Sequence, residues 1–291
     1  MDFLKKCFIA LSDNAISTAS PMTLINDGII HRYRVMGDRA GSKNGWYVLH
    51  GSEVMIAGSW KTSQQVVVHN TELETLSAHE REQRHRVIRE AQFKAAAEQL
   101  RQYTLTARNV ERLWERSPSA DQDHPYLIDK RVSAYGLRQT GDNLLVPLRD
   151  ASGKIWSVQF IEPSGKKWFA KGGRVRGCFH LIGEPGIKGT LMVCEGYATG
   201  ASIFNVLDNP VFAAFNAGNL IHAAKAIKEA YGSFIIMMAD NDRQTPGNPG
   251  ITQAMKAALA VNGNILWPPF SEGQPGTDFN DWLVPKGVDH E

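Results

Sequence analysis

The sequence is 291 residues long, 43% hydrophobic and 21% charged, which is typical of a globular protein with room for about two or three domains. No apolar run approaches the ~18 residues that a membrane-spanning helix needs, so we predict a cytoplasmic protein without a membrane partner. The three cysteines, Cys7, Cys178 and Cys194, are odd in number and widely spaced. They predict neither a disulfide framework nor a structural zinc site.

The net charge of +2 conceals an uneven distribution. Residues 119–182 contain ten Lys or Arg against six Asp or Glu, whereas residues 186–291 contain six against ten. A basic region followed by an acidic one suits a protein that holds a polyanion with one part and metal cations with the other. Ordinary variation of a solvated surface would produce the same imbalance, so charge alone does not decide between the two.

Residues 1–70 are predicted to form a small α+β domain. Its first 15 residues resemble a short amphipathic helix more than a signal peptide, because Ser12 and Asp13 interrupt the apolar run. Short strand-like runs separated by Gly, Ser, Asp and Asn then indicate an antiparallel meander. These runs cover residues 31–38, 45–51, 54–61 and 65–69.

Residues 71–118 are predicted to form a helical connector. The stretch from Thr71 to Arg116 contains no Gly or Pro, its charges are dense and mixed, and its apolar stripe is thin. We expect two helices here. The turn-rich segment 117–125 then predicts a loop and a domain boundary.

A basic mixed α+β subdomain is expected at residues 119–185. A helix should begin at His124-Pro125, and three strands follow, joined by the tight turns 151–153 and 163–165. The predicted strands cover residues 143–150, 154–162 and 166–172.

The pattern changes in residues 186–285, which are followed by a short tail at 286–291. Four nearly continuous apolar strands alternate with amphipathic helices, a pattern typical of a parallel sheet covered on both faces. The predicted fold class is therefore α/β, a doubly wound parallel sheet preceded by the two smaller units. Its strands are expected at residues 190–195, 211–215, 234–240 and 264–269.

Acidic residues follow two of these strands. Glu195 ends the first strand, and Asp240 and Asp242 follow the third. If the two strands are neighbours, the three carboxylates converge at the carboxyl edge of the sheet, where clustered acids and Mg²⁺ suit one another. Taken singly, a strand-end Glu also suits a helix start, and Asp-Asn-Asp is a common turn sequence.

The run VCEGYATGASI, followed by MADNDR, resembles the Toprim domain of bacterial-type primases, topoisomerases and certain nucleases. This resemblance implies that Glu195 is a catalytic or metal-linked glutamate and that Asp240 and Asp242 are metal ligands. Residues 124–283 as a whole resemble the primase catalytic core. The amino-terminal part resembles the leading region of Toprim primases carried by conjugative plasmids and phages.

The run GTDFNDWL resembles the closing acidic motif of the primase core, which implies that Asp278 is a further metal ligand. Asn280 stands where that motif tends to have a second acid, so a second metal position there is in doubt. Replicative bacterial primases also open with a zinc ribbon, which this chain's cysteines cannot build. The expected cofactor is therefore Mg²⁺ or Mn²⁺, without zinc.

A basic segment with interleaved aromatic residues precedes the α/β part. Cations that follow phosphates and aromatic faces that stack on bases are the usual means of binding single strands. A strand edge protected by lysines, with Trp168 buried, is the alternative. The expected nucleic-acid-binding residues are Lys130, Arg131, Lys166, Lys167, Trp168, Lys171, Arg174 and Arg176.

Together these features predict a DNA primase that makes short RNA primers on single-stranded DNA from nucleoside triphosphates. A nuclease using the same acids and a non-catalytic single-strand-binding protein are the alternatives. The sequence contains no G-x-x-x-x-G-K-[ST] motif, so it is not expected to unwind DNA by itself. A replicative helicase or a relaxase is therefore a candidate partner.

Overall fold

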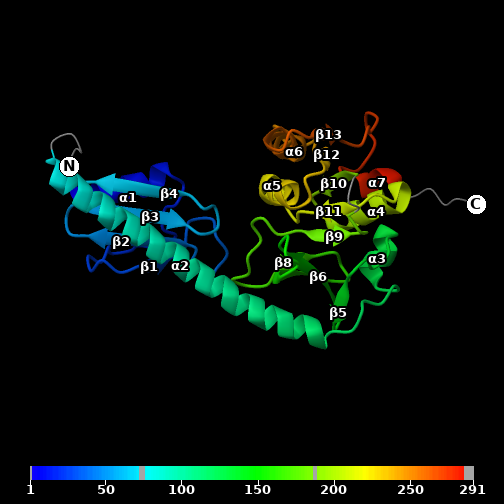
Figure 1. Cartoon of the computed structure of the whole chain (residues 1–291), viewed down its shortest axis with the longest axis horizontal. Coiled ribbons are helices and arrows are strands. Elements are labelled where there is room, and N and C mark those ends of the chain that lie inside the picture. The colour runs from blue at the N-terminus through cyan, green and yellow to red at the C-terminus, as the bar shows by residue number, and fades with distance from the viewer. Residues whose placement is uncertain (1, 72–75, 186–188, 285–291) are drawn as a thin grey trace, which may run out of the picture. The chain divides into compact units, whose positions relative to one another are not determined.

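The computed structural model describes residues 2–71, 76–185 and 189–284 and divides the chain into two compact units (Figure 1). Unit 1 comprises residues 1–101 and unit 2 comprises residues 102–291. The domain boundaries expected from the sequence, near residues 70, 118 and 185, stay predictions. None of the helices in the described part of the chain is long and apolar enough to cross a membrane.

Unit 1 contains a four-stranded antiparallel sheet in the order β1-β2-β3-β4. The predicted meander is therefore confirmed, although its first strand is shorter than expected. The helix predicted at the amino terminus is also present, as α1 (Phe3–Asp13). The strands are β1 (His31–Tyr33), β2 (Gly45–His50), β3 (Val54–Ser59) and β4 (Gln65–His69).

Helices cover both faces of this sheet, which explains why β2 and β3 are buried almost throughout. Phe3, Cys7 and Leu11 of α1 pack on one face. Ala91 and Ala95 of α2 pack on the other. Burial on two faces removes the polar alternation that a one-sided antiparallel sheet would show.

Helix α2 (Ala78–Arg116) is a single helix of 39 residues, so the prediction of two helices is wrong. No Gly or Pro interrupts it. A capping box fixes its start, because Ser77 and Glu80 each accept a hydrogen bond from the other's backbone N–H. The boundary between the two units falls within this helix.

The first sheet of unit 2 is antiparallel, in the order β5-β6-β7-β8. One face packs against Val110, Leu113 and Trp114 of α2. The other packs against α3 (Pro125–Lys130) and α4 (Tyr197–Leu207). Helix α3 begins where predicted, with the His124 side chain as its cap. The strands are β5 (Arg138–Thr140), β6 (Asn143–Arg149), β7 (Ile155–Ile161) and β8 (Lys167–Phe169).

The second sheet of unit 2 has the order β13-β12-β10-β11-β9 (Figure 1). The four strands from β10 to β13 are parallel and confirm the α/β prediction. Strand β9 joins antiparallel at the edge, although the sequence assigned its residues to the basic subdomain. The strands are β9 (His180–Ile182), β10 (Thr190–Cys194), β11 (Val211–Ala213), β12 (Phe234–Met238) and β13 (Asn264–Leu266).

Helices cover both faces of this sheet as well. Helices α4 (Tyr197–Leu207) and α7 (Phe279–Leu283) pack on one face around Met192, Val211 and Met238. Helices α5 (Leu220–Tyr231) and α6 (Pro249–Ala260), with the short η2 (Ala217–Asn219) before α5, pack on the other. The carboxyl edge of the parallel strands stays available for loops.

Candidate active site

The two acid-bearing strands are direct neighbours. Strands β10 and β12 pair in parallel, with Cys194 opposite Met238, so the chain leaves both strands at the same edge. Glu195 follows β10 at once, and Asp240 follows β12 after one residue. The adjacency that the sequence could only assume is therefore present, and it brings these acids to one edge of the sheet.

Asp278 approaches the same edge from the far end of the chain. It caps α7, where its Oδ1 accepts the Asp281 backbone N–H at 2.8 Å. Its Oδ2 accepts the Thr199 hydroxyl, which belongs to the first turn of α4, at 3.0 Å. Because α4 begins just after Glu195, this contact fixes Asp278 beside the other acids.

The loop after β12 is held by its own polar side chains. Asp242 Oδ2 accepts the Gly250 backbone N–H at 3.0 Å, and the Asp242 N–H donates to Asn248 Oδ1 at 2.9 Å. A Cβ atom on Gly250 would lie 2.3 Å from the Asp240 carbonyl oxygen, so only glycine fits there. Sequence reasoning missed Asn248 and Gly250, although the run Asn-Pro-Gly at a helix start was a usable signal.

Burial and the neighbouring acids raise the pKa of Asp240 and of Glu195. Burial, followed by the charges of Glu195, Asp278 and Asp242, raises the pKa of Asp240 to about 8. Burial and the charge of Asp242 likewise raise the pKa of Glu195. Asp240 Oδ1 is buried and has no hydrogen-bond partner among the described residues. The cluster therefore favours a bound cation.

The arrangement fits an open divalent-cation site better than a closed cage. Within residues 2–71, 76–185 and 189–284, no three His, Cys, Asp or Glu side chains form a ready-made metal cluster. Mg²⁺ is usually bound through one or two carboxylates and keeps several waters. Asp240 and Asp242 offer that pair of ligands, and the unpartnered Asp240 oxygen offers a ligand atom that no other group occupies.

Lys167 is the cation that faces the acids. Burial lowers the pKa of Lys167, while Asp278, Asp240 and Glu195 act in the opposite direction. The side chain is nonetheless exposed at the surface, and its ammonium lies 5.3 Å from the ring centroid of Tyr126. The site thus combines carboxylates for a metal with a cation for a second anionic group.

The residues of the predicted basic surface around β8 (Lys167–Phe169) point in different directions. Side chains alternate between the faces of β8, so neighbouring residues point in opposite directions. Trp168 stacks on Phe160 at 5.3 Å with an interplanar angle of 8°, and Lys166 lies 5.9 Å from the Trp168 ring. Phe169 contacts Phe215 edge-on, beside α4. Lys166, which directly precedes β8, lies near Trp168, whereas Lys167 lies near Tyr126, so the two neighbouring lysines contact different aromatic rings.

The remaining predicted cations differ in exposure. Lys171, Arg176 and Arg131 are exposed. Arg174 is half-buried, with its guanidinium 5.0 Å from the Trp156 ring centroid. Lys154 lies 3.9 Å from the same ring, and sequence reasoning missed it because it stands outside the dense basic run.

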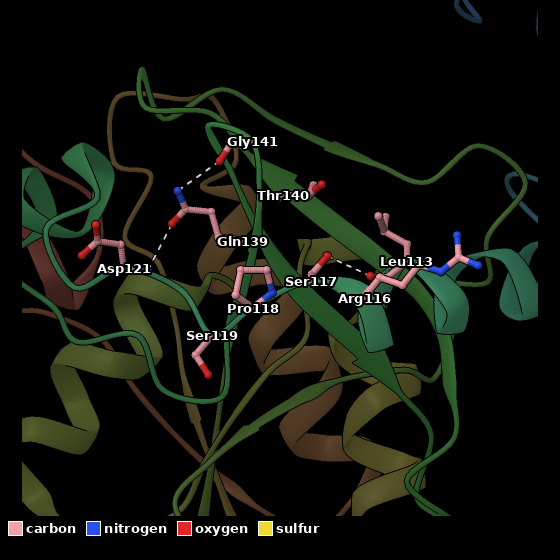
Figure 2. A pocket seen from close by; sticks show the side chains of 9 residues that line it. All are labelled: Leu113, Arg116, Ser117, Pro118, Ser119, Asp121, Gln139, Thr140 and Gly141. Carbon is pink, nitrogen blue, oxygen red and sulfur yellow. Dashed lines mark hydrogen bonds between the residues drawn. The ribbon is translucent and has the colours of Figure 1, made fainter.

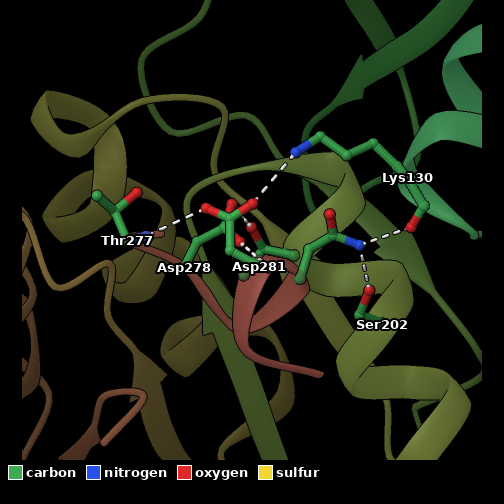
Figure 3. Close-up of polar contacts among 7 residues, drawn as sticks. Lys130, Ser202, Thr277, Asp278 and Asp281 are labelled. Carbon is green, nitrogen blue, oxygen red and sulfur yellow. Dashed lines mark hydrogen bonds and ion pairs between the residues drawn. The ribbon is translucent and has the colours of Figure 1, made fainter. Parts of the chain in front are cut away.

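Asn280 has a packing role that explains why it is not an acid, and its partners Lys130 and Ser202 are labelled in Figure 3. Its buried amide donates to the Lys130 carbonyl oxygen and to the Ser202 hydroxyl, both at 2.8 Å. It thereby joins α7 to α3 and α4. Lys130 also pairs with Asp281 at 3.5 Å, so Lys130 is only partly available to nucleic acid.

A separate pocket of about 380 Å³ lies at the end of α2 (Figure 2). It contains none of the acids described above. The polar contacts within it join its own walls, such as the Gln139 amide donating to the Gly141 carbonyl oxygen at 3.0 Å. Its lining comprises Leu113, Arg116, Ser117, Pro118, Ser119, Asp121, Gln139, Thr140 and Gly141.

Part of this chain matches a known domain family, and most of it is similar to named proteins. Residues 190–289 match the Toprim domain family. The chain is 35% identical over 264 residues to the DNA primase TraC of Escherichia coli, covering 86% of this chain and 25% of that protein. A second Escherichia coli DNA primase TraC is 32% identical over 263 residues, 86% of this chain and 18% of that protein. The chain thus spans a quarter or less of the length of these relatives.

Two solved primase structures are similar to part of this chain. The DnaG primase catalytic domain bound to single-stranded DNA is 14% identical, with a TM-score of 0.43, covering 66% of this chain and 77% of that one. The primase fragment of the bacteriophage T7 primase-helicase protein is 20% identical, with a TM-score of 0.42, covering 53% and 67%.

Proposed function

We propose that this chain, whose carboxy-terminal part is a Toprim domain similar to that of plasmid-type primases, is a DNA primase. It would synthesise short RNA primers on single-stranded DNA from nucleoside triphosphates, in the cytoplasm. One observation carries the proposal: Glu195, Asp240 and Asp242 converge at the carboxyl edge of two neighbouring parallel strands.

Asp240 and Asp242 would hold a divalent ion, Mg²⁺ or Mn²⁺, with Asp278 as a further ligand. When bound, the ion supplies positive charge for the attacking 3′-hydroxyl and for the leaving pyrophosphate. The same charge would offset the repulsion that raises the pKa of Asp240. We propose that the protein uses no zinc.

The chain's own groups would position the reactants. Glu195, whose pKa is raised, would either bind the metal indirectly or accept the proton of the attacking hydroxyl. Lys167 would hold triphosphate oxygens beside the acids, since a charge-assisted hydrogen bond to phosphate suits an ammonium in that position.

The template would bind through cations on the exposed parts of unit 2. Backbone phosphates attract cations without regard to sequence, and aromatic faces stack on bases. A replicative helicase or a relaxase would deliver the template. The residues proposed to contact the template are Lys130, Arg131, Lys166, Trp168, Lys171, Arg174 and Arg176.

A primer-synthesis assay tests this function. Wild-type protein with Mg²⁺, ribonucleotides and single-stranded templates should yield short labelled products, and Asp240→Asn should yield none while still binding DNA. Hydrolysis of labelled DNA without synthesis would favour a Toprim nuclease. DNA binding without synthesis or hydrolysis would favour a non-catalytic binding protein.

A further inference from the structure

Tyr126 carries a buried hydroxyl that the fold leaves unused. The residue lies in the first turn of α3, and only 2% of its surface is exposed. Its hydroxyl oxygen has no hydrogen-bond partner among the residues that the structure describes. Leaving a buried hydroxyl unpaired costs free energy, so a partner that arrives with a ligand would recover that cost.

The surroundings of this hydroxyl indicate what that partner would be. The Tyr126 ring lies 5.3 Å below the Lys167 ammonium, which also interacts with Asp240 and Glu195. The charge of Asp278 reaches the hydroxyl itself. A second unpartnered atom, Asp240 Oδ1, belongs to the same cluster of acids. The Tyr126 hydroxyl and the Asp240 Oδ1 atom are therefore an unpaired donor and an unpaired acceptor associated with the same group of acids.

No described residue accepts a hydrogen bond from this hydroxyl, and the carboxylate of Asp278, whose charge acts on it, already accepts hydrogen bonds from other donors. Both Asp278 oxygens accept hydrogen bonds, from the Asp281 N–H and from the Thr199 hydroxyl. Burial raises the pKa of Tyr126 far above the physiological range, so the hydroxyl keeps its proton. The hydroxyl is therefore an uncharged hydrogen-bond donor beside carboxylates that can bind a cation and a lysine, Lys167, that can bind an anion.

We propose that Tyr126 is a further ligand-binding residue of this site, whose hydroxyl donates to an oxygen carried by the bound Mg²⁺. That oxygen belongs either to a coordinated water or to a phosphate of the nucleoside triphosphate. The inference rests on the proposed function, because it requires the acids to bind the metal. Lys167 then supplies charge to the ligand, and Tyr126 supplies a directional hydrogen bond.

Tyr197 provides a matched control. It is equally buried, but its hydroxyl donates to the Ser133 carbonyl oxygen at 2.6 Å. Tyr197→Phe should therefore lower the melting temperature of the full chain in EDTA, because it removes the hydrogen bond between the Tyr197 hydroxyl and the Ser133 carbonyl oxygen. Tyr126→Phe should leave that temperature unchanged or raise it, because the hydroxyl that it removes makes no hydrogen bond in the metal-free protein.

The decisive measurement is thermal unfolding of the full chain against Mg²⁺ concentration, in one series with Mg²⁺ alone and in another with ATP present. Tyr126→Phe should raise the Mg²⁺ concentration for half-maximal stabilisation about tenfold, whereas Tyr197→Phe should not. An effect in both series identifies a coordinated water, and an effect only with ATP identifies a phosphate oxygen.

Two results would overturn the inference, and they differ. If wild-type protein is stabilised but Tyr126→Phe has the same half-maximal concentration in both series, the hydroxyl does not bind the ligand, and the proposed function stands. If Mg²⁺ stabilises wild-type protein in neither series, the metal site itself fails, and the proposed function fails with it.

Discussion

The buried carboxyl of Asp240 makes the stability of the folded protein depend on pH. The fold holds this carboxyl among three other acids and buries it, which raises its pKa from 3.8 to about 8. A raised pKa means that the folded protein binds a proton which the unfolded chain releases near pH 4. The stabilising effect of that proton is complete below the unfolded pKa and is lost as the pH rises through the folded pKa.

The metal-free protein should therefore lose stability as the pH rises from about 4 to about 8. Asp240→Asn cannot titrate, so its melting temperature in EDTA should fall less steeply over the same interval. Thermal unfolding of both proteins across this range checks the prediction. Parallel curves for the two proteins would contradict the raised pKa of Asp240.

Lys166, which directly precedes β8, and Lys167, the first residue of β8, offer a comparison between neighbouring lysines that contact different aromatic rings. Lys167→Ala should reduce kcat/KM for nucleotides by about ten- to a hundredfold, because a charge-assisted hydrogen bond to phosphate is lost, and should leave DNA affinity nearly unchanged. Lys166→Ala should do the reverse, with the log–log salt slope for single-stranded DNA reduced by roughly 0.7. Primer synthesis and fluorescence anisotropy measure the two effects. Equal effects of both substitutions would show that the two lysines share one surface.

At the scale of elements, the segment 268–278 depends on the loop after β12. The Arg243 guanidinium lies 4.5 Å from the Phe270 ring centroid and donates to the Gln274 carbonyl oxygen. The Asn241 N–H donates to the Thr277 carbonyl oxygen at 2.6 Å. Thr277 immediately precedes Asp278, so these contacts link the two acid-bearing loops.

Arg243→Lys should loosen that link, because an ammonium cannot both stack on Phe270 and reach Gln274 as a planar guanidinium does. We expect the Mg²⁺ concentration for half-maximal primer synthesis to rise several-fold, together with faster hydrogen exchange in residues 268–278. Lys256→Ala, on the exposed side of α6, is the control and should change neither. Unchanged exchange in Arg243→Lys would mean that the segment holds its position without the arginine.

At the scale of the whole molecule, the three cysteines belong to three different cores. Cys7 packs in unit 1, Cys178 packs between α3, α4 and the antiparallel sheet, and Cys194 packs under α4 and α7. Burial raises the pKa of Cys7 to about 11 and that of Cys178 to about 12, and it also raises the pKa of Cys194. A cysteine must be a thiolate to bind zinc, so each of these environments disfavours zinc binding by its cysteine.

Purified protein should therefore contain far less than one zinc per chain. Treatment with a zinc chelator, followed by Mg²⁺, should leave primer synthesis at its original rate. Metal analysis by mass spectrometry, paired with the activity assay, checks this. One tightly held zinc per chain whose removal abolishes activity would contradict the prediction.

The sequence by itself determined the features that depend on neighbouring residues. Periodicity and turn residues marked the meander of unit 1, the start of α3 and the alternation of strands and helices from β10 to β13. The positions of Glu195, Asp240 and Asp242 after strands were readable for the same reason. The length of α2 was misjudged, because a thin apolar stripe suggested a break where no Gly or Pro imposes one.

The tertiary structure alone decided what depends on contacts between distant residues. Strand order placed β10 beside β12, and it added β9 to a sheet that its local sequence did not indicate. Strand pairing and packing turned Lys167 toward the acids and Trp168 onto Phe160. The unpaired Tyr126 hydroxyl is visible only when every neighbour is known, because hydrogen-bond satisfaction is a property of the packed interior and not of any local pattern.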